Sequence, residues 1–403
     1  MVKRRVCQRL GPEFPPHGDH PHAGTIQAKA LSSALARIRV PALTLALVLA
    51  LAVVTSPAWS QGPLPVSLGE PIQVARPFIT HDTKAGTPRG ISGFACLPPD
   101  QGQQGQQGRR ACLAINDEER FAEWAWFDGS TLTPTGELLE LLSKGKQPDD
   151  AIIGTRPRGL CAKDQGFGEF DGEAIAIAGD QVYLTGSHAC SRAKGQFRPS
   201  SFILARARAE PREQRAGEVE RTWRVADVLR HSPLAATFGR PGSEGAGIEG
   251  LAVVGDRLYL GLRTPAPDRA TILAVEVAGL FAPGEQPAKV TPEALTLKLG
   301  AEAGIRDLAA LKDGRLLVLG GPADGGVAPF MLHLLTPATG ESRRLVELRT
   351  EELGKKKGGG DEVAKAEAIA ILEESPVEIC LLVLYDNIPD GGPRRHRIGL
   401  LVD

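Results

Sequence analysis

Short apolar runs recur along the chain in pairs. The clearest pair lies in residues 247–265, GIEGLAVVGDRLYLGLRTP, where Glu249 opens an apolar run and an alternating second run ends at Arg263. The dipeptide Gly255-Asp256 separates the two runs. Alternation with a period of two on both sides of a Gly-Asp turn predicts a β-hairpin with polar residues at its open end.

This hairpin repeats. Copies begin at Asp171 (DGEAIAIAGDQVYLTGSH), Ile305 (IRDLAALKDGRLLVLGG) and Ala366 (AEAIAILEESPVEICLLVLYDN), and a looser copy begins at Ile91. Further strand-like runs follow each hairpin, so four repeats hold four strands each and the last holds three. An isolated strand that begins at Ile72 can supply the missing one. The sequence therefore predicts an all-β fold, a single β-propeller of five motif-bearing blades closed by an N-terminal strand.

Composition agrees with this fold class. The 403 residues include 47 Gly and 31 Pro, which suit many short strands and turns, and 42% hydrophobic residues provide a core. The blade number has one alternative, because residues 128–168 and 210–242 are long enough to hold a sixth blade without the motif.

The beginning of the chain has the features of a secretory signal. Arg37 and Arg39 precede an apolar run over residues 40–54, and small residues follow up to Ser60, after which we expect cleavage. An uncleaved membrane anchor is the alternative. We interpret residues 1–36 as disordered or as a mis-assigned start, 37–60 as the signal peptide, 61–71 as a leader and 72–403 as the propeller domain. The protein is then periplasmic or secreted.

Charge limits the partners. Without residues 1–60 the chain keeps 40 basic and 46 acidic side chains, a net charge of −6. A modestly acidic surface gives no support for nucleic-acid binding. We expect a monomer without a stable membrane span after processing, with a small-molecule or cell-envelope ligand at the channel mouth.

Cysteines in an exported chain are expected to form disulfides. Cys96 and Cys112 stand at the two ends of an insertion in the first hairpin, where paired strands bring them face to face, and we predict a bond between them. Cys161 and Cys190 flank the second hairpin and form a second candidate pair. Cys380 is left over within an apolar run, and we interpret it as a small buried hydrophobic residue.

The polar ends of the hairpins are the candidate site. In a propeller, the start of each innermost strand and the end of the next lie on the same face of the disc. At strand starts the sequence has Ser92, Glu173, Glu249, Asp307 and Glu367, and at second-strand ends it has Asp117, Ser187, His188, Arg263, Asp386 and Asn387. These side chains are expected to form a carboxylate-rich funnel at the channel mouth.

Two interpretations of the carboxylates stay open. Each can accept backbone N–H bonds from a neighbouring blade and only hold the ring together. Alternatively, several together are hard oxygen ligands suited to Ca²⁺. The candidate metal ligands are Glu173, Glu249, Glu367, Asp386, Asp117 and Asp307, with His188 and Arg263 as catalytic residues that orient a substrate.

No nucleophile motif accompanies them. Ser187 and His188 are neighbours on an extended strand and point to opposite sides, so they do not form a dyad. The chain has no GxSxG motif, phosphate-binding loop or dinucleotide fingerprint.

The segments IEGLAVVGDRLYLGLRTP, DGEAIAIAGDQVYLTGSHACSR and KAEAIAIL resemble the bacterial family known as domain of unknown function 3616, over roughly residues 91–403. More distantly, the hairpins look like those of esterase-like phytase propellers and six-bladed calcium-dependent lactonases. The resemblance implies a propeller-like fold but no chemistry. Ala174 and Ala368 replace the glycine that follows the acid in the motif, and Ser92 replaces the acid itself, so the acidic ring is not uniform.

Two functions follow from these features. The chain is either a metal-dependent phosphoesterase or esterase-like hydrolase that acts at the channel mouth, with Ca²⁺ as the candidate cofactor, or a non-catalytic propeller of the cell envelope that binds a ligand or partner. The sequence does not identify the substrate.

Overall fold

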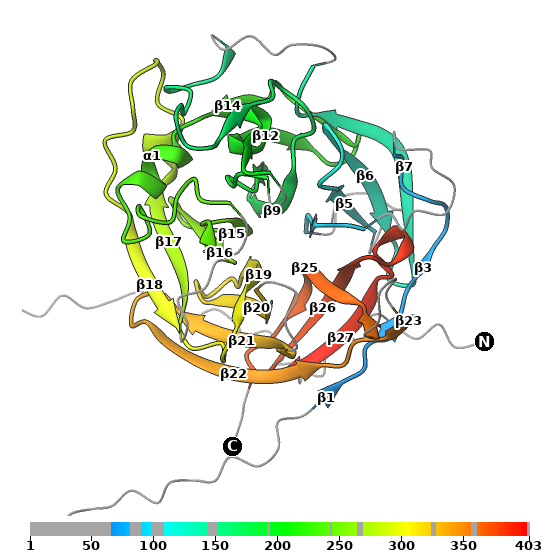
Figure 1. Ribbon diagram of the computed structural model, residues 1–403. Coiled ribbons are helices and arrows are strands. Elements are labelled where there is room, and N and C mark those ends of the chain that lie inside the picture. Colours follow the sequence, from blue (N-terminus) through cyan, green and yellow to red (C-terminus); the bar gives the residue numbers. More distant parts are fainter. Residues whose placement is uncertain are drawn as a thin grey trace, which may run out of the picture. The chain divides into compact units, whose positions relative to one another are not determined.

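Five β-sheets follow one another around a common centre in the computed structural model, and each forms one blade of a β-propeller (Figure 1). The blades are numbered in chain order. Blade 1 contains β4 (Gly93–Cys96), β5 (Arg110–Ile115), β6 (Phe121–Phe127) and β7 (Thr131–Glu140); blade 2 contains β9 (Gly172–Ala178), β10 (Gln181–Gly186), β12 (Leu204–Glu210) and β14 (Glu220–Thr222); blade 3 contains β15 (Ile248–Val254), β16 (Arg257–Leu262), β17 (Ala270–Glu276) and β18 (Glu293–Leu297); blade 4 contains β19 (Ala303–Ala310), β20 (Leu316–Pro322), β21 (Phe330–Thr336) and β22 (Glu341–Leu348); blade 5 contains β25 (Lys365–Glu374), β26 (Glu378–Asp386) and β27 (Arg394–Gly399).

The structure describes residues 66–80, 90–98, 109–143, 151–191, 194–241, 244–263, 269–323, 328–355 and 361–400. Within these ranges the predicted all-β propeller of five blades is confirmed, and the two intervals proposed for a sixth blade hold none. The expected disordered start and signal peptide lie outside the described residues. No helix among the described residues is long and apolar enough to span a membrane.

The predicted hairpins form the inner half of each blade. In blade 3, Val254 pairs with Arg257, which leaves a two-residue turn at Gly255 and Asp256. Gly255 has φ +62°, a conformation that strains residues with a side chain. Innermost strands of neighbouring blades contact one another, and β25 contacts β4, which closes the ring. Almost every residue of β15 is buried because the neighbouring blades cover both of its faces.

The ring is closed by more of the N-terminal segment than the sequence predicted. As expected, this segment joins the last blade, since β2 (Glu70–Pro71) pairs with β27 and Ile72 N donates to Pro393 O at 2.9 Å. In addition, β1 (Val66–Ser67) pairs with β22, and β3 (Gln73–Val74) pairs with β7, both in parallel. Residues 66–74 thus connect blades 4, 5 and 1, and pairing starts inside the stretch interpreted as a leader.

Smaller elements lie outside the four-stranded blades. They are α1 (Val225–Arg230), α2 (Val277–Leu280), the 3-10 turns η2 (Pro199–Phe202) and η4 (Pro389–Gly391), the strand pair β8 (Lys163–Asp164) and β11 (Gln196–Phe197), the edge strand β13 (Arg215–Ala216), and the hairpin of β23 (Glu352–Lys355) and β24 (Asp361–Val363).

Both predicted disulfides are present. Cys96 bonds to Cys112 across the paired strands β4 and β5, and Cys161 bonds to Cys190 beside blade 2. The interpretation of Cys380 needs a correction. It is buried in β26, as expected, but it is also disulfide-bonded.

Candidate functional site

A cavity of about 310 Å³ lies where the inner strands of the five blades begin. Six acidic and four basic side chains line it, and the lining residues include no aromatic. The predicted residues Asp117, Glu173, Glu249, Arg263, Glu367 and Asp386 all line this cavity, whereas His188 and Asp307 do not. The structure therefore brings six of the eight candidates together at the expected face.

One position of the innermost strand recurs in the cavity lining of all five blades. The residues at this position are Ser92, Glu173, Glu249, Arg306 and Glu367. In blades 2 to 5 the strand pairing skips this residue, so it is the extra residue of a β-bulge. A bulge bends the strand and re-aims a side chain. Repetition of the same bulge thus aims one side chain from each of these blades into the cavity.

Arg306 is the site residue that the sequence analysis missed. The motif in blade 4, IRDLA, places Asp307 where the acid was expected, but Ile305 and Leu308 correspond to Ile248 and Leu251 of IEGLA. In that alignment Arg306 occupies the same motif position as Glu249. The arginine can therefore be found in the sequence if the repeats are aligned by their apolar residues rather than by the acid.

Arg306 neutralises two of the predicted metal ligands. Its guanidinium forms a salt bridge with Glu249 of blade 3 at 2.7 Å and another with Glu367 of blade 5. Glu249 also pairs with Arg263. Only 2% of the Glu249 side chain and 8% of the Arg306 side chain are exposed. The four residues form a buried ion network across blades 3, 4 and 5, in which two arginines stand beside two glutamates.

Asp307 holds the ring together, which is the first of the two interpretations considered for the carboxylates. Its carboxylate accepts hydrogen bonds from Leu308 N at 2.7 Å and from Ile369 N of blade 5 at 2.8 Å. Burial raises the pKa of Asp307 well above its usual value, against the opposing effect of backbone donors that include Leu251 of blade 3.

Glu173 is the one bulge glutamate that has no salt bridge among the described residues. Burial, together with the nearby carboxylates Asp171 and Asp117, raises its pKa to about 8. Asp117 stays accessible to water inside the cavity, but enclosure by protein and the charges of Asp171 and Asp386 raise its pKa to about 7. Both groups can therefore gain or lose a proton near neutral pH.

The remaining candidates have other partners. Asp386 pairs with Lys365 at 3.2 Å. His188 is fully buried, and its ring packs edge-on against Phe202 at 5.9 Å. Burial lowers its pKa to about 3, so the ring is neutral at physiological pH. His188 does not line the cavity, and its backbone is left-handed with φ +52° rather than extended as the sequence predicted.

A metal site does not fit the side chains as placed. Within the described ranges, no group of three or more His, Cys, Asp or Glu is arranged to hold an ion. Glu249 and Glu367 are occupied by arginine, and Asp307 by backbone amides. Calcium binding stays a prediction.

Comparisons with known proteins give a family and distant structural likenesses. The family described as "Protein of unknown function (DUF3616)" matches residues 199–400. The chain is similar in structure to a candidate glycoside hydrolase from Parabacteroides distasonis, with 12% identity, TM-score 0.40, and 78% of this chain and 88% of that chain covered. It is also similar to the Bombyx mori GH32 β-fructofuranosidase BmSUC1, with 10% identity, TM-score 0.30, and coverage of 83% and 60%. A third likeness is to PorZ of Porphyromonas gingivalis, a surface component of the type-IX secretion system, with 11% identity, TM-score 0.31, and coverage of 69% and 31%. Likenesses at this level carry no argument about function. No curated protein matches the chain.

Proposed function

Because the chain belongs to the DUF3616 family, whose description names no activity, the chemistry has to be inferred from the cavity, and we propose that the protein is a hydrolase that acts there on an ester of a small, highly polar molecule. The signal-like residues 37–60 and the disulfides support an exported enzyme, periplasmic or secreted.

The observation that carries the proposal is the state of Glu173. It occupies the same bulge position as Glu249 and Glu367, but those two are held by arginines while Glu173 stands with Asp117 and Asp171. The two aspartates raise the pKa of Glu173 more than the charges of Arg263 and Arg306 lower it, and an unbalanced cluster of like charges of this kind is typical of functional sites. Groups that titrate near the working pH are efficient acids and bases.

In the proposed reaction, protonated Glu173 donates its proton to the leaving-group oxygen of the ester. Ionised Asp117 accepts a proton from the attacking water, whose oxygen forms the new bond to the acyl carbon or phosphorus as the bond to the leaving oxygen breaks. The ion network of Arg263, Glu249 and Arg306 forms a further part of the cavity lining. No step passes through a metal ion.

A panel of 4-nitrophenyl carboxylic esters, lactones, phosphomonoesters and phytate tests this proposal, with EDTA or added Ca²⁺ in parallel to test the calcium prediction. Glu173→Gln should lower the rate on the accepted ester by about 10² or more. Glu367→Gln is the matched control at the equivalent position and should retain most activity below its melting temperature. Wild-type turnover should fall above about pH 8, where Glu173 loses its proton. Equal activity of Glu173→Gln and wild type would refute the assignment.

The alternative is a ligand-binding propeller without turnover. The observation in its favour is that the arginines in the ion network are already paired with glutamates, which gives the cavity a fixed polar shape suited to recognition. In that case the panel yields no product, while a bound ligand still raises the melting temperature.

A further inference from the structure

Much of the cavity lining comes from a stretch between β10 and β12 that belongs to no blade. We call its cavity-lining residues the recognition wall: Ser187, Ala189, Cys190, Ser191, Gln196, Arg198 and Ser201. The recognition wall offers hydroxyl, amide and guanidinium groups, which suit hydrogen bonding to a polar ligand. The blades contribute mainly the charged residues.

The hydrogen bonds of residues 190–198 run mainly to other segments outside the blades, since Ala162 N donates to Gly195 O at 2.8 Å and Gln165 N donates to Phe197 O at 2.9 Å. Within the recognition wall, Gln196 N donates to Ser191 Oγ at 3.0 Å. The parallel pair of β8 and β11, with two residues in each strand, belongs to this set of contacts, and Cys190 forms an isolated bridge with Pro241. An isolated two-stranded sheet of this length is marginally stable. The blades, by contrast, are four-stranded and packed on both faces.

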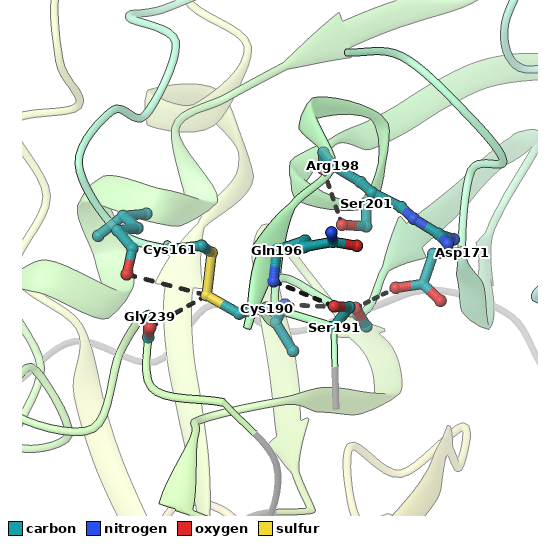
Figure 2. The surroundings of a disulfide bond; sticks show 11 residues. Cys161, Asp171, Cys190, Ser191, Gln196, Arg198, Ser201 and Gly239 are labelled. Atoms are coloured by element: carbon teal, nitrogen blue, oxygen red, sulfur yellow. Dashed lines mark hydrogen bonds between the residues drawn. A yellow bond between two sulfur atoms is a disulfide. The ribbon is translucent and has the colours of Figure 1, made fainter. Parts of the chain in front are cut away.

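The Cys161–Cys190 disulfide adds a covalent restraint to these contacts. Cys161 lies two residues before β8, and Cys190 is itself part of the recognition wall. In Figure 2 the disulfide stands on one side of β11, and Arg198 extends on the other side toward Asp171. Arg198 is held by Glu169 at 2.8 Å, and Ser187 Oγ donates to Asp171. The recognition wall therefore faces the acidic cluster of Asp171, Glu173 and Asp117.

We propose that the recognition wall selects the ligand of the cavity and that the Cys161–Cys190 disulfide positions it, so that reduction of this bond weakens recognition while the ring stays folded. The inference rests on the proposed function in taking the cavity as the substrate site. Reduction requires a dithiol reductant, which supplies two electrons and two protons and becomes a disulfide itself, while Cys161 and Cys190 become thiols. The released segment then opens locally, because its remaining hydrogen bonds run mainly to segments outside the blades.

The other disulfide provides a matched control. Cys96–Cys112 joins neighbouring strands of blade 1, and neither cysteine lines the cavity. Its sequence separation of 16 residues is comparable with the 29 residues of Cys161–Cys190. Loss of either bond should therefore release similar chain entropy in the unfolded state. Only loss of Cys161–Cys190 should loosen the recognition wall.

The experiment compares Cys161→Ser/Cys190→Ser with Cys96→Ser/Cys112→Ser by hydrogen exchange and mass spectrometry on the full chain. Peptides that cover residues 194–198 should exchange at least about tenfold faster in the first variant only, while peptides from β9 and β10 stay protected in both. With the 4-nitrophenyl ester that the panel identifies, KM should rise about tenfold in the first variant and stay within about twofold in the control.

Equal exchange of residues 194–198 in the two variants would overturn the positioning role of the disulfide. Faster exchange with an unchanged KM would overturn the selecting role of the recognition wall. If the panel finds no turnover, the hydrolase proposal fails separately, and the exchange comparison still decides whether the disulfide holds this segment.

Discussion

Glu249→Gln tests whether the centre of the ring is held by arginine or by a metal ion. The substitution keeps the shape of the side chain and removes its charge. In the structure, Glu249 lies between Arg263 and Arg306, and 2% of its side chain is exposed. The change therefore removes the carboxylate that Arg263 and Arg306 share, while Arg306 keeps its salt bridge with Glu367.

The expected loss of stability follows from burial. Removal of one partner from a buried salt bridge costs about 3–5 kcal/mol. The lower value, about 3 kcal/mol, applies because Arg306 keeps Glu367 and because Gln can still accept a hydrogen bond. The unit that includes Leu64–Asp403 should unfold with an entropy of roughly 0.7 kcal/mol/K, so the melting temperature should fall by about 4 °C.

The assay is thermal unfolding of wild type and variant, each with EDTA and with excess Ca²⁺. Glu293→Gln is the matched control on the same blade, since Glu293 pairs with Arg257 at 2.8 Å but has 52% of its side chain exposed. An exposed pair contributes at most about 1 kcal/mol, so the control should lower the melting temperature by roughly 1 °C.

Two results would refute this reasoning. If Glu249→Gln melts at the same temperature as Glu293→Gln, the buried network does not stabilise the ring. If Ca²⁺ stabilises the wild type and this shift disappears in Glu249→Gln, then Glu249 is a metal ligand rather than a partner of arginine.

Further predictions concern pH and the N-terminal segment. The stability contributed by Asp117 and Glu173 should fall as pH rises from about 4 to 8, because these groups have folded pKa values of about 7 and 8 in place of 3.8 and 4.5. Between these values the folded state holds protons that the unfolded state has released. The stabilisation is complete below about pH 4 and is lost as pH passes 7 and 8. The double variant Asp117→Asn/Glu173→Gln should therefore show a flatter dependence of melting temperature on pH. A chain that starts at Pro77 lacks the strands that join blades 4, 5 and 1 and should be less stable in denaturant than a chain that starts at Leu64. Equal midpoints for the two truncations would contradict the closure described here.

The sequence alone was sufficient for the fold because a hairpin is a local structure. The two-residue Gly-Asp turn and the alternation on both sides of it fix strand pairing within residues 247–263 without reference to the rest of the chain. Repetition of that pattern predicted an array of blades, since each blade can bury its faces only against another, and the strand at Ile72 that completes the last repeat predicted closure into a ring. The same local logic placed Cys96 opposite Cys112.

The pairing of residues 66–74 with three blades could not be predicted from local sequence patterns. Their strands have two residues each and pair with three different blades, so no periodic pattern marks them. Only the closed ring, which brings β22, β27 and β7 to one side, creates the edges to which they bind.

For the candidate site, the sequence predicted which residues lie at the cavity, whereas the tertiary structure determined their charged partners. The sequence placed six of the eight candidate residues at the cavity because strand ends follow from the hairpins. It did not distinguish Glu173 from Glu249 and Glu367, which occupy equivalent positions in nearly the same motif. That difference depends on which side chain the adjacent blade presents: Arg306 lies between Glu249 and Glu367, whereas Glu173 lies near Asp117. Charge on a neighbouring blade is a tertiary property, and it decides which glutamate is held in a salt bridge and which can exchange a proton.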